Sequence, residues 1–412
     1  MKYYFSLFIL FGVAVVKAQF NSEFMKYSDY RAHISPYGEA EWNSTALHNK
    51  FFQSIYAGNE IDIQSKDKVS DKLLQKNVAG AIANFGINAF FGKEKSRFDW
   101  LVGIKHQEFL NCSFSKDLFR TTFYGNSEFK GKYADLNNTA FNYFKFQEFK
   151  LGFIWKNVDT SGKLGGALSF ISGQRVLQYK TLDTNYLYTA PDATELIYQA
   201  NFSLSMSDST PRGLFGMAGV GLSGDLYAET PYRSKWGNSR FIISVNNLGF
   251  IRWNKNSRRY SVDSVFNFQG VQLNNILDLN DSVLNSINAD TLINRTTELS
   301  KDYFNVNLPM NFLLIHEVSF NTKYSLRVGF RNIFNANFRP FFFVENRFNL
   351  HPNYKLGGTF SYGGYGKFSG GIYAEYKIQK WNFRLGSNAI QGIVMSDKTF
   401  GGSMYLTLVK IW

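Results

Sequence analysis

The chain has a single cysteine, Cys112, and only seven prolines among its 412 residues. One cysteine excludes a framework of intrachain disulfides, so an exported chain of this length must be held together by packing and hydrogen bonds. It also excludes a lipoprotein, which needs a cysteine directly after its leader. Within the sequence LNCSF, Cys112 is most simply a small apolar residue of a strand wall.

Long apolar runs are missing after Val16, and no later stretch approaches the roughly 18 uninterrupted apolar residues of a membrane-spanning helix. The chain begins MKYYFSLFILFGVAVVKAQF, in which Lys2 precedes an apolar stretch and Lys17-Ala18 follows it. This pattern predicts a secretory signal peptide over residues 1–18, cleaved after Ala18. A membrane anchor is the alternative, but its apolar run falls short of the roughly 20 residues that a span needs.

Histidine is also scarce, and the spacing of the histidines does not suit a metal site. The five are His33, His48, His106, His316 and His351. GVGLSG, from Gly219 to Gly224, has the spacing of a dinucleotide fingerprint but lies in an alternating segment with no predicted helix after it. The helix N-terminus that would hold a phosphate is therefore missing, and we predict no enzyme, cofactor or metal site.

The formal net charge is +13, yet the basic residues stand singly along the chain rather than in clusters. An exported chain meets little nucleic acid, so we expect no nucleic-acid partner. A polar lumen and contact with anionic outer-membrane lipid and lipopolysaccharide account for the positive charge.

Aromatic residues and glycine are abundant in place of apolar runs. The chain has 42 Phe, 24 Tyr and 34 Gly, with a mean hydropathy of −0.24. A helical membrane protein would be more apolar. Rich aromatics with modest hydropathy are typical of a transmembrane β-barrel, in which half of each strand faces water and aromatic girdles mark both interfaces.

Alternating segments recur from about residue 97 to the end. In RFDWLVGIKH, for example, Phe98, Trp100 and Val102 share one face and Asp99 and Lys105 the other. Counting such segments predicts 12 to 16 strands, and an even number near 14 fits the length. A soluble sandwich would concentrate its aromatics where two sheets meet. One closed antiparallel sheet, an all-β transmembrane barrel, explains the uniform alternation more simply.

The stretch FSGGIYAEYKIQKWNFRLGS assigns side chains to the two faces of the wall. The residues predicted to face lipid are Phe368, Ile372, Tyr376, Trp381 and Phe383. The residues predicted to face the lumen are Arg327, Arg331, Lys355, Glu375, Lys377 and Arg384. These charges either fill a narrow lumen by pairing with one another or line a path for a solute.

Two regions do not alternate. Residues 19–95 are predicted to contain a plug-like segment and a first strand, with a strand near residues 53–63 and a helix near 71–84. Residues 270–302 have Leu and Ile at helical spacing and predict a partly helical long loop. The barrel itself is assigned to residues 96–412.

The segment SVNNLGFIRWNKNSRRYSVDSVFNFQGV, the pair Leu308-Pro309 that is expected to open the next strand, and DLFRTTFYGNSEFKG carry a resemblance. They resemble a group of uncharacterised outer-membrane barrel proteins of Bacteroidota. That group is similar in turn to the 14-stranded long-chain fatty-acid transporter type. The final segment GGSMYLTLVKIW ends on Trp412, as closing strands of such barrels commonly end on an aromatic residue.

This resemblance implies a fold and a location in the Gram-negative outer membrane, and two functions stay open. The first is a channel or transporter for a hydrophobic or amphipathic solute. The second is a barrel without transport activity whose loops dock another envelope protein, such as a component of type IX secretion or gliding machinery.

Overall fold

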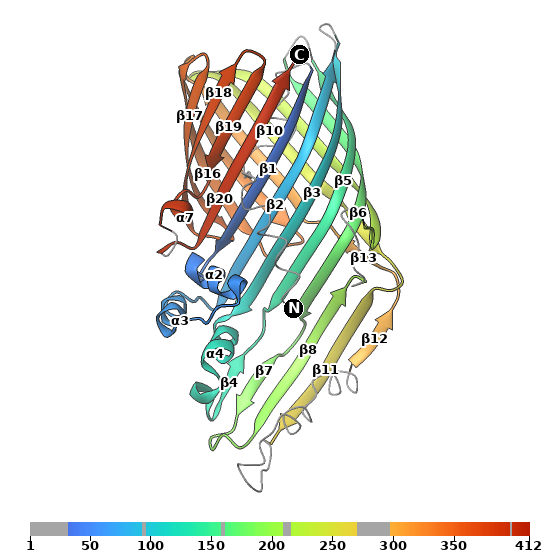
Figure 1. Cartoon of the computed structure of the whole chain (residues 1–412), viewed down its shortest axis with the longest axis vertical. Coiled ribbons are helices and arrows are strands. Elements are labelled where there is room, and N and C mark those ends of the chain that lie inside the picture. Colours follow the sequence, from blue (N-terminus) through green and yellow to red (C-terminus); the bar gives the residue numbers. More distant parts are fainter. Residues whose placement is uncertain (1–31, 93–95, 158–160, 209–215, 270–296, 396–397) are drawn as a thin grey trace.

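The structure, a computed structural model, describes residues 32–92, 96–157, 161–208, 216–269, 297–395 and 398–412. The predicted signal peptide lies outside these residues. Within them, all strands belong to one connected sheet that is antiparallel throughout the wall (Figure 1). Strand β1 (His33–Ser44) pairs with both β2 (Lys76–Gly92) and β20 (Gly401–Ile411). The first and last strands of the wall therefore close it into a barrel.

Between β2 and β20, each wall strand pairs with the next one around the barrel. In order they are β3 (Phe98–Ser115), β5 (Ala140–Lys156), β6 (Lys163–Thr181), β9 (Gly219–Ser234), β10 (Gly237–Trp253), β13 (Phe304–Asn307), β14 (Met310–Ser319), β15 (Tyr324–Phe334), β16 (Arg339–His351), β17 (Tyr354–Gly364), β18 (Phe368–Ile378) and β19 (Trp381–Ser387). Strands β13 and β14 both pair with β10 and form one interrupted strand, so the wall has 14 strands. The predicted all-β barrel of about 14 strands is confirmed.

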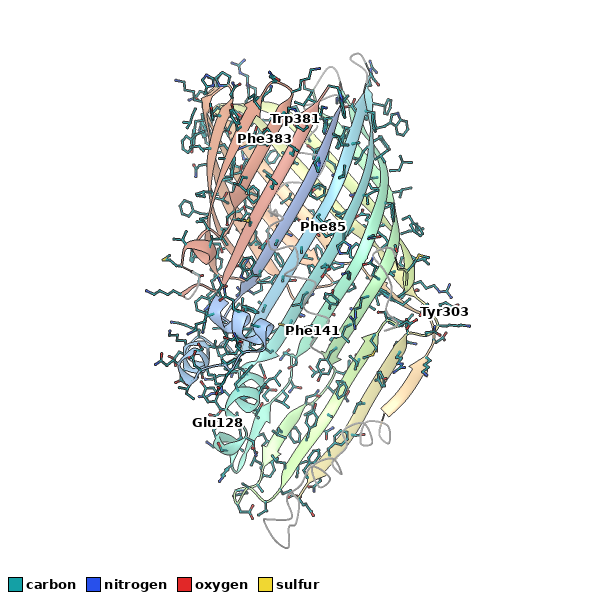
Figure 2. All side chains as sticks on the ribbon, in the orientation of Figure 1. Phe85, Glu128, Phe141, Tyr303, Trp381 and Phe383 are labelled. Atoms are coloured by element: carbon teal, nitrogen blue, oxygen red, sulfur yellow. The ribbon has the colours of Figure 1, made fainter. Side chains whose placement is uncertain are left out.

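Alternation of side chains gives the wall two different faces. On β17, Leu356, Phe360 and Tyr362 are exposed, whereas Thr359 and Ser361 between them are buried. The same pattern places large apolar side chains on the outside of the other wall strands, and Figure 2 marks Phe85, Trp381 and Phe383 on that wall. A side-chain period of two thus separates an apolar exterior from a polar and aromatic interior.

Several inward-facing glycines make room for large rings. A Cβ at Gly357 would overlap the ring of Tyr373, and one at Gly80 would overlap the ring of Tyr365. Both rings are buried inside the barrel. The absence of a side chain at these glycines is therefore what lets aromatic rings cross the narrow interior.

We expect Gly357→Val to destabilise the barrel by about 1–3 kcal/mol, because the new side chain must displace Tyr373 from a packed interior. The matched control is Gly358→Val, where the nearest neighbour of a new Cβ is the Gly371 carbonyl oxygen at 3.9 Å. Urea unfolding of both variants in phospholipid vesicles measures the difference. Equal midpoints for the two variants would show that Tyr373 does not need this space.

The two ends of the barrel differ. At the end where β1 begins and β20 ends, connections are short, as in residues 235–236, 352–353 and 379–380. At the opposite end the four longest connections span residues 45–75, 116–139, 182–218 and 254–303, while residues 335–338, 365–367 and 388–400 form shorter ones. Short turns at the end where β1 begins and β20 ends, with long connections at the other end, are the arrangement of outer-membrane barrels.

The described part of the predicted 19–95 segment is not a plug. Residues 33–44 and 76–92 are the wall strands β1 and β2, and between them lie helices α2 (Asn49–Ala57) and α3 (Ile63–Ser70). The strand predicted near residues 53–63 and the helix predicted near 71–84 are both wrong. The barrel begins at residue 33 and not at 96.

Helices cover part of the long-loop end. Helices α2 and α3 pack beside α4 (Lys116–Tyr124) around Phe51, Val69 and Phe119. Two short helices lie outside this cluster, η2 (Ser127–Phe129) and α7 (Gln391–Val394). The buried His48 caps α2, because its Nδ1 accepts from the Phe51 N–H at 3.2 Å. Its Nε2 donates to the Ser65 carbonyl at 3.2 Å. Burial lowers the pKa of His48, which favours the neutral ring that this cap requires.

Five further strands continue the same sheet beyond the barrel (Figure 1), and this part of it is here called the extension sheet. They are β4 (Lys132–Asp135), β7 (Tyr186–Thr189), β8 (Leu196–Met206), β11 (Arg258–Phe268) and β12 (Thr297–Lys301). Strand β6 joins the extension sheet to the barrel wall, because it pairs with β9 up to Gly173 and with β8 from Leu177. Residues 297–301 of the predicted helical loop are a strand, and 270–296 lie outside the described residues.

Among the residues that the structure describes, no helix is long and apolar enough to cross a membrane.

Candidate functional site: the barrel interior and a break in its wall

Strands β14, β15 and β16 bring a cluster of charges into the interior, here called the arginine network. Register places Arg327 opposite both Glu317 and Glu345, and its Nε is paired with Glu317. Arg347 contacts both carboxylates, at 3.4 Å to Glu317 and 3.2 Å to Glu345. Arg240 lies 2.8 Å from Glu317. Side chains buried this deeply in a low-dielectric interior need such partners to remain charged.

One aromatic hydroxyl, that of Tyr373, and a fourth arginine, Arg384, join the network. Tyr373 donates to Glu345 at 3.1 Å and accepts from Arg347 Nε at 3.0 Å. The guanidinium carbon of Arg384 lies 4.0 Å from the Tyr373 ring centre, and one guanidinium nitrogen lies 3.8 Å from a Glu345 carboxylate oxygen. The hydrogen bonds of Tyr373 fix the network across the space that Gly357 leaves open.

A second cluster, the lysine network, lies on the strands across the barrel. Glu148 accepts from Lys105 at 2.5 Å and from Lys150 at 3.3 Å, and Lys150 also pairs with Asp225. All four side chains are at most 8% exposed. Two lysines face two carboxylates here, so the lysine network is locally neutral, whereas the arginine network has more arginines than carboxylates.

Buried apolar side chains fill the parts of the lumen that the two charge networks leave open. One cluster joins Phe90 of β2, Ile242 of β10, Phe343 of β16 and Val409 of β20. A second includes Phe146, Trp253 and Tyr365. Because these strands stand all around the barrel, their side chains meet across the lumen and occupy it.

The structure shows where each residue predicted to face the lumen lies. Arg327 and Arg384 belong to the arginine network, and Arg331 lies 3.7 Å from Glu41 and 2.9 Å from Asn311. Lys355 pairs with Glu375 at 2.9 Å. Lys377 is exposed on the same face, further along β18. That they line a path for a solute stays a prediction.

Sequence reasoning missed the carboxylates that these arginines contact. Glu317 was among those missed, as were Glu148 and Asp225 of the lysine network. Glu345 and Arg347 stand at positions that alternate with the exposed Val344 and Phe348. Applying the same period of two to RPFFFVENRFNL would have placed Glu345 and Arg347 on the polar face.

The residues predicted to face lipid lie on the outer, apolar face of β18 and β19. Phe368 is 81% exposed and Ile372 56%, while Tyr376 and Phe383 are close to 40%. Trp381 is half-buried, because the Lys410 ammonium lies 5.2 Å from its ring centre. Lys410 thus sits on the apolar face with its charge against aromatic rings near the end of the strand.

The wall is irregular at one place, here called the wall break. On β10 the register shifts between Val245 and Leu248, and Asn247 there has φ 61°. Opposite it, Leu308 and Pro309 separate β13 from β14, which corrects the prediction that this pair opens a strand. Proline has no N–H to donate to the neighbouring strand.

Few contacts hold the wall break together. The Leu308 N–H donates to the Gly249 carbonyl at 2.9 Å, and the Asn247 side-chain amide donates to the Pro309 carbonyl at 3.4 Å. Inside the barrel, Asn247 is tied to the lysine network, because its N–H donates to Asp225 at 2.9 Å and its Oδ1 accepts from Lys105 at 3.3 Å. One asparagine therefore links the weakest part of the wall to the interior charges.

The described residues contain no group of His, Cys, Asp and Glu side chains that could hold a metal ion. GVGLSG lies inside strand β9, with no helix directly after it.

Comparisons with known proteins place the chain in a family. A search of curated proteins finds no match. Among solved structures, the Ralstonia pickettii toluene transporter TbuX is 8% identical with a TM-score of 0.43, covering 93% of this chain and 90% of that one. A Pseudomonas aeruginosa FadL homologue is 9% identical with the same TM-score, covering 93% and 90%.

The translocator domain of the autotransporter NalP from Neisseria meningitidis is 10% identical, covering 93% of this chain and 89% of that one, at a TM-score of 0.35. Likeness of this degree assigns neither a substrate nor a route. Residues 34–388, which span the wall from β1 to the end of β19, match the model of a family of unknown function, DUF5723. The chain belongs to that family.

Proposed function

We propose that the protein resides in the outer membrane and passes a hydrophobic or amphipathic solute from the long-loop end into the barrel and out sideways through the wall break. The observation that carries this proposal is that many side-chain contacts block the lumen, whereas few hydrogen bonds close the wall break. Side chains meet across the lumen, whereas the wall break is held by one backbone hydrogen bond and two side-chain hydrogen bonds, the second from the Asn335 amide to the Leu308 carbonyl at 3.0 Å. A route through the wall therefore disturbs fewer contacts than a route along the axis.

The surface outside the wall break supports the proposal. Leu248 and Phe250 are exposed there, on the apolar outer face of β10. A solute that leaves at this place passes from the interior directly onto an apolar surface. Burial of apolar area favours that step, since about 25 cal/mol is gained per Å² removed from water.

The exterior also supports a membrane location. Phe98, Trp100, Val102 and Ile104 are exposed in succession on the outer face of β3. The next outward residues are His106 and Glu108, and Glu108 accepts from Lys145 at 2.8 Å. An apolar band that ends in a zone of paired charges is what a hydrocarbon layer and its headgroup boundary require.

Joining the two sides of the wall break tests the route. Cysteines at Leu248 and Pro309, in a Cys112→Ala background, form a disulfide on oxidation that closes the break. We expect oxidation to reduce uptake of the dye N-phenyl-1-naphthylamine to the rate of cells that lack the protein, and reduction to restore it. The matched control is Ile243→Cys with Leu314→Cys, a directly opposed pair on β10 and β14 in regular ladder.

Undiminished uptake by the oxidised Leu248/Pro309 variant would contradict the sideways route. Uptake that equals the background in both redox states, and in the unmodified protein, would contradict transport itself.

We propose as a second candidate that the barrel docks another envelope protein, such as a component of secretion or gliding machinery. The extension sheet favours this candidate, because five strands beyond the barrel are more structure than a channel needs. Copurification of a second envelope protein at fixed ratio, lost when the extension sheet is removed, would support it.

A further inference from the structure

A cavity lies in the crease where the extension sheet leaves the barrel, with a volume of about 590 Å³. It is lined by Gln178 of β6, Ser205 of β8, Arg252 of β10, Arg259 of β11, and Tyr303 and Asn305 at β13. The crease therefore collects side chains from the barrel wall and the extension sheet, and none of these residues belongs to the arginine or lysine networks.

The two arginines of the crease differ from those of the interior. Among the described residues, neither guanidinium forms an ion pair or a hydrogen bond, whereas Arg240, Arg327 and Arg347 all contact carboxylates. The nearby Asp302 carboxylate accepts from the Tyr303 backbone N–H at 2.6 Å. Arg252 and Arg259 are both exposed, so their charges face the cavity and solvent.

Each of the two guanidiniums lies near an aromatic ring. The guanidinium carbon of Arg252 is 4.8 Å from the ring centre of Tyr303, and that of Arg259 is 5.9 Å from the ring centre of Phe304. These contacts restrict the side chains without neutralising them. A guanidinium whose position is held before binding loses less conformational entropy when it meets an anion.

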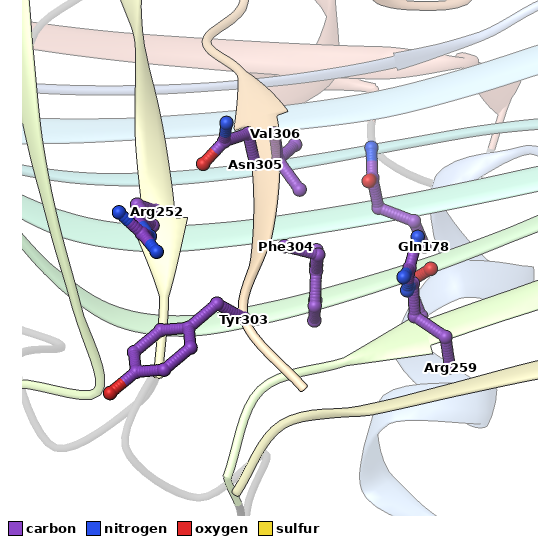
Figure 3. Close-up of a pocket in the computed structure, with 8 residues that line it drawn as sticks. Gln178, Arg252, Arg259, Tyr303, Phe304, Asn305 and Val306 are labelled. Atoms are coloured by element: carbon purple, nitrogen blue, oxygen red, sulfur yellow. The ribbon is translucent and has the colours of Figure 1, made fainter. Parts of the chain in front are cut away.

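Figure 3 shows the two arginines on different sides of β13, with Tyr303 near Arg252 and Gln178 near Arg259. Two cationic groups that are separated in this way suit a ligand with two anionic groups better than one small anion. Gln178, Ser205 and Asn305 add neutral donors and acceptors of the kind that bind sugar hydroxyls.

We propose that the crease binds a phosphorylated saccharide headgroup, with one phosphate on Arg252, a second on Arg259, and sugar hydroxyls on the amide and hydroxyl side chains. Guanidinium groups bind phosphate through paired N–H donors, so this ligand matches the charge and the polarity of the cavity. The source is a glycolipid of the outer leaflet, because the crease lies at the long-loop end of the barrel. The choice of a glycolipid as the ligand depends on the proposed outer-membrane location of the protein. It does not depend on the proposed transport activity.

The test uses the full-length refolded protein and vesicles of phosphatidylcholine with or without diphosphoryl lipid A. We expect binding of lipid A to fall by roughly 10-fold or more in Arg252→Gln and in Arg259→Gln, the size of a lost charge-assisted hydrogen bond. Arg258→Gln is the matched control. Arg258 carries the same charge one residue away on β11, where side chains alternate between faces, and it does not line the cavity.

A loss in Arg258→Gln as large as in Arg259→Gln would overturn the assignment, because general surface charge would then explain binding. Inorganic phosphate that displaces lipid A at equal phosphate concentration would overturn the glycolipid source in favour of a small phosphate. Faster migration of the unboiled variants on a gel confirms that they fold. If that holds and uptake is normal, a failure to bind lipid A counts against this site alone.

Discussion

Glu317→Gln is expected to lower the free energy of unfolding by about 3–5 kcal/mol, the cost of leaving buried charges without their partner. Glu317 contacts Arg240, Arg327 and Arg347. The substitution keeps the size of the side chain and removes its charge. Arg327, Arg347 and Arg384 then share the single carboxylate of Glu345, whereas Arg240 keeps Glu229 at 2.9 Å. Urea unfolding of the protein in phospholipid vesicles, followed by tryptophan fluorescence, measures the change.

Glu375→Gln is the control for this prediction. Its carboxylate is buried, pairs with Lys355 at 2.9 Å and accepts from the Asn382 amide at 3.1 Å. Because Lys355 is 39% exposed and stays solvated without its partner, we expect a smaller cost of about 1 kcal/mol. Adding Arg327→Gln to Glu317→Gln should recover part of the lost stability, because it removes one of the crowded positive charges. Equal costs for Glu317→Gln and Glu375→Gln would mean that the arginine network does not stabilise the interior.

Phe360→Arg is expected to cost about 2–4 kcal/mol in phospholipid vesicles, because it places a charge in the middle of the lipid-facing wall. Phe360 lies halfway along β17 and is 70% exposed on the outer face. Phe368, at the first position of β18, is 81% exposed on the same face. Phe368→Arg should cost only about 0–1 kcal/mol, because its charge reaches the headgroup layer.

The two phenylalanine variants are compared by urea unfolding in the same vesicles. A cost that follows exposure, with Phe368→Arg worse than Phe360→Arg, would contradict the placement of the wall in lipid. Depth in the membrane, and not exposure in the isolated protein, decides the predicted order.

The faces of the strands could be predicted from the sequence, but the partners of their side chains could not. Alternation alone places Arg327 and Glu375 on the inner face. The contact between Arg327 and Glu317 depends on which residue of β14 stands opposite, and that register follows from the closed sheet. Local periodicity carries no information of this kind.

The N-terminal segment was mispredicted for a related reason. KNVAGAIANFGINAFFG is rich in Ala and Gly, and in its first half these small residues obscure the difference between its two faces. It becomes strand β2 because β1 and β3 pair with it on both sides. Tertiary pairing overrides weak local preference in such strands.

The pairing of β8 with β11 makes two insertions of the chain depend on each other. Residues 182–218 supply β8 and residues 254–303 supply β11, so removing one of them would leave the other with a long unpaired edge. Exposed edges of that kind promote aggregation. The barrel wall closes without the two insertions. Gly173 of β6 pairs with Gly219 of β9, and Trp253 of β10 pairs with Phe304 of β13. The two insertions therefore form one unit, which relatives would have to gain or lose together.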